Sequence, residues 1–179
     1  DSYVASVVAA MLLGVALVTQ GFADRYVVFP LMVSAAGILA SIIGVQLVRV
    51  KKGGDPGRAL NMGTIITCVL FAGFVAVVVF GGGFTLGVYI PAVAGVLIGL
   101  IIGYTTNIFT SDLYRPVKQV AKYSESGSAV NIITGFSYGL LSIVPLIIGI
   151  VAAMLAAYFG APAWGIDGIY GVSIAAVGM

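Results

Sequence analysis

Charged residues are sparse in this sequence and divide it into long uncharged runs. These runs extend from Ser2 to Ala23, Tyr26 to Val48, Ala59 to Ser111, Ser126 to Ile166 and Gly168 to Met179. A helix rises about 1.5 Å per residue and the hydrocarbon core of a bilayer is about 30 Å thick, so about twenty apolar residues make one crossing. The first two runs therefore predict one transmembrane helix each.

The run from Ala59 to Ser111 is too long for one crossing, even by a tilted helix, so it must double back. Three consecutive glycines, Gly81 to Gly83, supply the backbone freedom for a tight reversal near its middle. The predicted spans lie near residues 2–19, 26–48, 62–80, 85–104, 130–158 and 168–179. We expect the sixth span to be truncated and residues 1–179 to form a single membrane-embedded helical region, a fragment of a larger transporter.

The composition agrees with a lipid environment, since 61% of the residues are hydrophobic and 8% are charged. About 25% of the residues of a soluble domain are charged, so a water-soluble globule is excluded. The runs are apolar on every face and lack the alternation that is typical of barrel strands. The sequence therefore predicts an all-α fold, a polytopic membrane helix bundle of about six transmembrane segments in a lipid bilayer.

The positive charges lie mainly in two connections, and the net charge of +2 is too small to indicate a nucleic-acid partner. The first basic connection joins spans two and three, and the second joins spans four and five. Their cationic residues are Arg49, Lys51, Lys52, Arg58, Arg115, Lys118 and Lys122. By the positive-inside rule both connections face the cytoplasm, which predicts a multi-pass protein of the cell inner membrane.

The side chains that usually carry catalysis are scarce. The chain has no histidine, and Cys68 is its only cysteine, so imidazole chemistry, an internal disulfide and a cysteine zinc site are excluded. We expect Cys68 to be a small buried apolar residue. The sequence predicts no catalytic, cofactor-binding or metal-binding residue within these 179 positions.

Two further patterns predict local structure. Glycines spaced four residues apart on spans four and five predict a smooth helix face on which a neighbouring backbone can approach; they are Gly95, Gly99, Gly103, Gly135 and Gly139. In the connection after span four, Ser111 or Asp112 can cap a short helix with Lys118 and Lys122 outward. This connection is interpreted as a solvated loop, with anion binding by Arg115 and Lys118 as the alternative.

Asp1 is the only carboxylate attached directly to an apolar span, and the hydroxyl of Ser2 stands beside it. A carboxylate at membrane depth is costly, which favours an ion or proton site. A helix cap is the other interpretation, and the residues alone leave both open.

The segment from Tyr104 to Val117 resembles the membrane-integral inorganic pyrophosphatases, the ion pumps driven by pyrophosphate. That family shows a similar T-x-x-x-T-S-x-x-Y-R-P-V segment, followed by N-I-I-x-G, which is found here from Asn131 to Gly135. Two weaker matches are Asp1 to Val4, which resembles the family's sixth helix, and Tyr170 to Met179, which resembles the start of the eleventh.

The resemblance implies an internal fragment of a pump that couples diphosphate hydrolysis to transport of H+ or Na+. It also implies pyrophosphate as substrate, Mg2+ as cofactor of the intact protein, K+ as an activator in some members, and a homodimer. The family's aspartate-rich motifs for magnesium pyrophosphate are not found in this sequence. We therefore expect the fragment alone to be inactive as a hydrolase.

The resemblance also implies an ion gate at Asp1 and Ser2, because sodium-pumping members carry a glutamate followed by serine and tyrosine there. The side chain of Asp1 is one methylene shorter than that glutamate, and the reach of the carboxylate helps to decide whether a sodium ion or a proton is held. Ala5 stands where some proton-pumping members place their glutamate, and Asn107 stands where many relatives have an acidic residue. The alternative functions are part of a secondary transporter with no hydrolytic activity and a purely structural membrane subunit.

The orientation can be tested by cysteine labelling of the full-length protein with Cys68 replaced by alanine. Lys51→Cys and Lys118→Cys should react with a membrane-impermeant maleimide from the same side of sealed vesicles, because both basic connections are predicted to be cytoplasmic. Asp24→Cys is the control and should react from the opposite side. Labelling of Lys51→Cys and Lys118→Cys from opposite sides would contradict the predicted topology.

Overall fold

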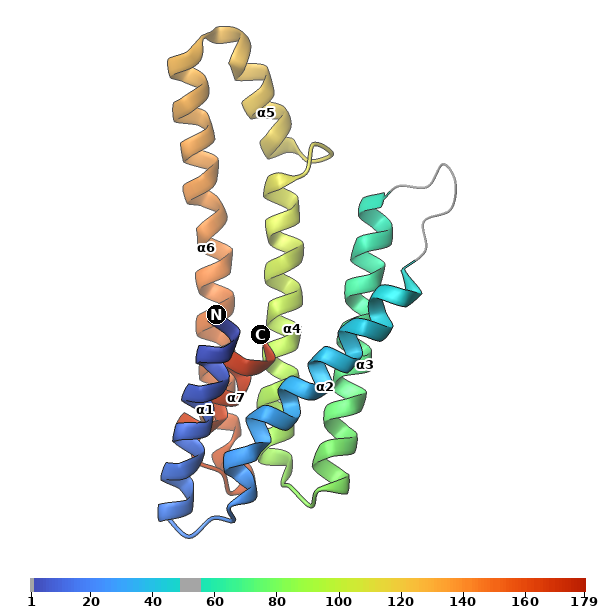
Figure 1. Cartoon of the computed structure of the whole chain (residues 1–179). Helices are drawn as coiled ribbons and strands as arrows, with labels where there is room; N and C mark the ends of the chain where they lie inside the picture. Colours follow the sequence, from blue (N-terminus) through green and yellow to red (C-terminus); the bar gives the residue numbers. More distant parts are fainter. Residues whose placement is uncertain (1, 49–55) are drawn as a thin grey trace. The chain divides into compact units, whose positions relative to one another are not determined.

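The computed structural model describes residues 2–48 and 56–179 (Figure 1). The described residues form α-helices and two short 3-10 turns, without a strand. The elements are α1 Ser2–Thr19, α2 Arg25–Leu47, α3 Pro56–Gly81, α4 Leu86–Thr110, α5 Arg115–Tyr123, η1 Ser124–Ser126, α6 Ser128–Gly160, η2 Pro162–Trp164 and α7 Gly168–Gly178. The prediction of an all-α polytopic membrane bundle is confirmed.

Four of the described helices, α2, α3, α4 and α6, are long and apolar enough to cross a bilayer by length and composition. The first and last described helices, α1 and α7, are apolar but shorter. α4 extends to Thr110, beyond the predicted span near residues 85–104, and threonine hydroxyls near its end donate to carbonyls of their own helix.

The predicted cap of the short helix is wrong. α5 begins at Arg115, and its N-cap is Tyr114, which makes no side-chain cap hydrogen bond. The reason is Pro116, which is favoured in the first turn of a helix because it has no backbone N–H. If the helix began at Ser111 or Asp112, the carbonyl of Asp112 would need that N–H and would be left without a donor. Ser111 Oγ instead accepts a 3.4 Å hydrogen bond from the backbone N–H of Leu113.

The chain divides into two compact units. The first comprises Asp1–Leu100 and Ala153–Met179, and the second comprises Ile101–Ala152. The first unit contains α1, α2, α3, α7 and parts of α4 and α6, and its connections α1–α2, α3–α4 and α6–α7 lie at one end of the unit (Figure 1). The second unit contains α5 between the remaining parts of α4 and α6.

Small residues allow α4 and α7 to approach closely within the first unit. A Cβ added at Gly95 would collide with the carbonyl group of Ala175, and one added at Gly99 would lie 2.9 Å from the carbonyl oxygen of Met179. The predicted packing face is therefore confirmed at Gly95 and Gly99. Of the predicted glycines, three would meet no described atom within 4 Å, so their packing role is not realised within the described residues; they are Gly103, Gly135 and Gly139.

The predicted reversal at the three glycines is confirmed, since α3 ends at Gly81 and α4 begins at Leu86. Gly83 has a φ of +65°, a conformation that costs glycine little. The guanidinium of Arg25, the first residue of α2, contacts this turn. Arg25 Nη1 donates a hydrogen bond to the carbonyl of Gly82 at 3.1 Å, and the guanidinium carbon Cζ lies 5.4 Å from the ring centroid of Phe84.

One buried hydrogen bond joins α7 to α2 at the same end of the unit. Pro30 lies inside α2 and has no backbone N–H, so the carbonyl of Tyr26, four residues earlier, has no partner within the helix. The Tyr170 hydroxyl donates to this carbonyl at 2.6 Å. The rings of Tyr26 and Tyr170 also pack edge to face, 6.2 Å apart, and both residues are buried.

This bond can be tested by thermal unfolding of the full-length protein in detergent. Tyr170→Phe should lower the free energy of unfolding by about 1–3 kcal/mol, because the Tyr26 carbonyl is left buried without a donor. Pro30→Ala supplies an N–H to that carbonyl, so the Tyr170→Phe loss should be smaller in the Pro30→Ala background. Tyr158→Phe, which removes an exposed hydroxyl, is the control. Equal losses with and without Pro30 would show that the two positions are not coupled.

Candidate functional site

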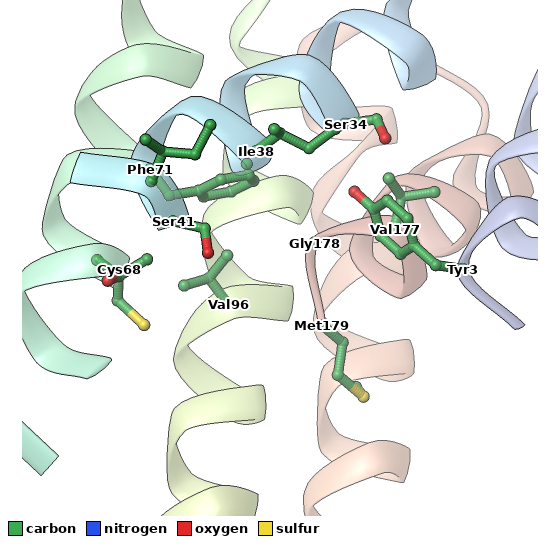
Figure 2. A pocket seen from close by; sticks show the side chains of 13 residues that line it. Tyr3, Ser34, Ile38, Ser41, Cys68, Phe71, Val96, Val177, Gly178 and Met179 are labelled. Carbon is green, nitrogen blue, oxygen red and sulfur yellow. The ribbon is translucent and has the colours of Figure 1, made fainter. Parts of the chain in front are cut away.

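A cavity of about 440 Å³ lies inside the first unit, between α1, α2, α3, α4 and α7 (Figure 2). Its wall is mostly apolar, with hydroxyl groups and a thiol set into it. The lining residues are Tyr3, Ser34, Gly37, Ile38, Ser41, Ile42, Thr67, Cys68, Phe71, Val96, Val177, Gly178 and Met179. A cavity of this size, with a few polar groups in an apolar wall, is typical of a site for a small molecule or for water.

The polar groups of the cavity come mainly from α2 and α3, and none of the lining side chains is charged. Ser34 is buried, at 8% exposure, and lies about two helical turns from Ser41 along α2. Thr67 Oγ1 donates to the carbonyl of Gly63 at 2.9 Å, so its oxygen remains an acceptor toward the cavity. The wall can therefore hydrate or orient a neutral or singly charged species, and it supplies no general base.

Two glycines of α2, Gly37 and Gly44, lie beside side chains that line the cavity. A Cβ at Gly37 would lie 3.4 Å from the ring of Phe71 and 3.9 Å from the hydroxyl oxygen of Tyr3. A Cβ at Gly44 would collide with the hydroxyl of Thr67. The absence of a side chain at Gly44 therefore allows α3 to lie close to α2 beside the cavity, whereas the distances at Gly37 are ordinary van der Waals contacts.

The predicted gate residues stand at the start of the helix that contributes Tyr3. Asp1 lies outside the described residues, and Ser2 is the first residue of α1, with its side chain not described. Tyr3, the third residue of the Asp1-Ser2-Tyr3 motif, lines the cavity. Asn107 lies in the second unit, in the last turns of α4, and takes no part in the cavity.

Sequence reasoning missed the hydroxyls of Ser34, Ser41 and Thr67. A signal was present, since Ser34 and Ser41 are seven residues apart in an otherwise apolar run and so share a helix face with Gly37. The contribution of Thr67 comes from the approach of α3 to α2, which only the tertiary structure specifies.

The donors of the cavity do not fit a divalent cation such as Mg2+. Mg2+ prefers an octahedral set of oxygen ligands that includes carboxylates, and the lining contains hydroxyls and a thiol but no carboxylate. Among residues 2–48 and 56–179, no group of three or more cysteines and carboxylates could hold a metal ion. We derive no chemical step through Mg2+ from these residues.

Comparisons with known proteins identify relatives along the whole chain. The family model described as inorganic H+ pyrophosphatase matches residues 1–179. A putative K(+)-stimulated pyrophosphate-energized sodium pump from Clostridium tetani is 38% identical over 185 residues, which is 100% of this chain and 26% of that protein. A K(+)-insensitive pyrophosphate-energized proton pump from Methanosarcina mazei is 40% identical over 189 residues, which is 100% of this chain and 27% of that protein.

A further relative is K(+)-insensitive pyrophosphate-energized proton pump 2 from Moorella thermoacetica. It is 38% identical over 186 residues, again 100% of this chain and 27% of the relative. The chain thus spans about a quarter of the length of the curated relatives that it matches. These relatives include pumps named for sodium and pumps named for protons, at similar identities.

The cavity can be tested through Cys68, whose side chain is half-buried at its wall. In the full-length protein, the Cys68 thiol should react with the small neutral reagent methyl methanethiosulfonate. Ser41→Leu should slow this reaction severalfold, because the larger side chain occupies space beside the thiol. Ser142→Leu, in the second unit, is the matched control and should leave the rate unchanged. An unchanged rate in Ser41→Leu would contradict a cavity shared by these two residues.

Proposed function

Because this chain belongs to the inorganic H+ pyrophosphatase family, we propose that it is a membrane-embedded part of a pyrophosphate-energised cation pump. The observation that carries the proposal is the family match over residues 1–179, together with apolar helices suited to crossing a bilayer. The chain is an integral, multi-pass membrane segment. The whole protein would hydrolyse pyrophosphate and move H+ or Na+ across the membrane, as its relatives' names state for them.

The proposal assigns transport and not hydrolysis to these residues. The cavity wall is uncharged, and the described carboxylates do not form a metal-holding group. Attack of water on a phosphoanhydride needs a metal ion or a general base that activates the water, so the hydrolytic residues belong to other parts of the protein. In this proposal Mg2+ and pyrophosphate bind there, and the 179 residues alone are inactive as a hydrolase.

The proposed ion gate consists of Asp1 and Ser2. Support comes from their position in the sequence, directly before Tyr3, whose side chain lines the hydroxyl-bearing cavity. A carboxylate at the start of an apolar helix can hold a proton or a partly dehydrated cation, and a neighbouring hydroxyl adds an oxygen ligand. The hydroxyls of Ser34, Ser41 and Thr67 would hold a small amount of water in the cavity that Tyr3 lines.

The basic connections face the cytoplasm of the cell inner membrane, the whole protein is a homodimer, and residues 1–179 form a single membrane region within it. K+ is an activator or has no effect, since the relatives include K+-stimulated and K+-insensitive pumps. A secondary transporter without hydrolysis is disfavoured, because these relatives are named as pyrophosphate-energised.

The gate can be tested with the full-length protein in inside-out vesicles supplied with magnesium pyrophosphate. The unaltered protein should acidify the lumen or accumulate radioactive sodium. Asp1→Asn should abolish this ion movement, because the amide can neither carry the proton nor neutralise the cation. Asp1→Glu should retain transport, and a shift toward sodium is expected if the reach of the carboxylate decides cation choice.

Asp24→Asn is the matched control, since Asp24 is exposed at the start of α2 and makes no side-chain cap hydrogen bond. It should transport ions at the unaltered rate. Normal transport by Asp1→Asn would refute the gate and leave the pump in place. Absence of both hydrolysis and transport in the unaltered full-length protein would refute the pump.

A further inference from the structure

The second unit contains a short basic helix beside a membrane helix, and nothing in the proposed pump mechanism uses it. In α5, the exposed cations Arg115, Lys118 and Lys122 follow a three- and four-residue spacing, which places them on one side of the helix. We propose that the groove between α5 and α6 binds an anionic phospholipid, with its headgroup on α5 and an acyl chain along α6. This inference depends on the membrane embedding and is independent of pumping.

The groove itself is a cavity of about 410 Å³ with both apolar and hydrogen-bonding walls. α5 contributes Gln119 and Tyr123, and α6 contributes Thr134, Ser137 and Tyr138 among others. In the described residues, no hydrogen bond uses the side chains of Gln119, Tyr123 or Tyr138. An amide and two phenol groups therefore remain for the ester and phosphate oxygens of a headgroup.

The cations are placed to reach a headgroup in this groove. Arg115 precedes Gln119 by one helical turn, so it continues the row of residues that faces the groove, while Lys118 and Lys122 form the adjacent row. No salt bridge in the described part of the chain occupies these three side chains. The nearest carboxylates in the sequence, Asp112 and Glu125, lie beyond the two ends of α5. An anion is the complementary ligand.

The apolar side of the groove favours a lipid over a free anion. Ile133 and Leu141 line the groove from α6, and both are more than half exposed, at 67% and 54%. The same side of α6 continues away from α5 with Val144 and Ile148, which are also exposed. Inorganic phosphate would leave this apolar strip uncovered, whereas an acyl chain would cover it. The groove also lies where the chain connects two helices long and apolar enough to cross a bilayer, α4 and α6.

The test uses the full-length protein in detergent micelles with fluorescent phosphatidylglycerol as the probe and fluorescent phosphatidylcholine as the neutral comparison. The unaltered protein should bind phosphatidylglycerol more tightly. Lys118→Gln together with Lys122→Gln should weaken that binding about 25-fold, since each cation near an anionic headgroup is worth about fivefold. Replacing both lysines by arginine should preserve binding. Ser137→Phe should weaken it without a change of charge, because the ring fills the groove.

The matched control removes the same number of charges elsewhere, by Lys51→Gln together with Lys52→Gln, and should leave binding unchanged. An equal loss in this control would show diffuse attraction to a positive surface and would overturn the site. Displacement of the fluorescent lipid by excess inorganic phosphate or pyrophosphate would identify a free-anion site instead and would also overturn the proposal. Unchanged lipid binding in Ser137→Phe would show that the lipid does not bind in the groove.

Discussion

The packing at one end of the first unit depends on a carbonyl group that its own helix cannot satisfy. Pro30 removes the N–H that would bond to Tyr26, and the Tyr170 hydroxyl supplies a donor from α7 at 2.6 Å. In a bilayer no water replaces a missing partner, so this demand is stronger than in a soluble protein. Asp167 orients α7 for this contact by accepting a 2.8 Å bond from the N–H of Ile169 at its first turn. A helix defect in α2 thereby fixes the position of a helix far along the chain.

Close approach of backbones is the second constraint, and it explains why the cavity forms where it does. Gly95 and Gly99 allow α7 to lie against α4, and Gly44 allows α3 to lie against α2. Hydrophobic side chains gain little by leaving lipid for protein, so van der Waals packing of small residues replaces the hydrophobic effect as the source of association. Larger side chains between these contacts, such as Phe71, cannot fill all the space that remains. The unfilled space between the helices is the cavity, and its hydroxyl groups belong to the small residues Ser34, Ser41 and Thr67.

The uncharged cavity lining and the basic helix α5 suit two different functions. The lining of the cavity in the first unit is uncharged, so in the proposed gate the carboxylate of Asp1 would be the charged group that determines which cation is held. The cations of α5 lie outside the apolar segments and are exposed, so they can attract anions without first being buried in an apolar environment. Transport and lipid binding would thus use different parts of the chain and different signs of charge.

The sequence alone determined the helical class, the reversal at Gly81 to Gly83 and the family, because these follow from local hydrophobicity, backbone freedom and an uninterrupted motif. It predicted a short helix in the second basic connection but misplaced the start of that helix. Pro116 cannot donate a hydrogen bond to the Asp112 carbonyl, and this outweighed the preference of Ser111 or Asp112 for a capping position. The partner of the Tyr26 carbonyl and the meeting of Thr67 with the serines of α2 were decided by tertiary structure alone. Both depend on contacts between segments distant in the chain, and no local pattern specifies which distant segment supplies the donor or closes the wall.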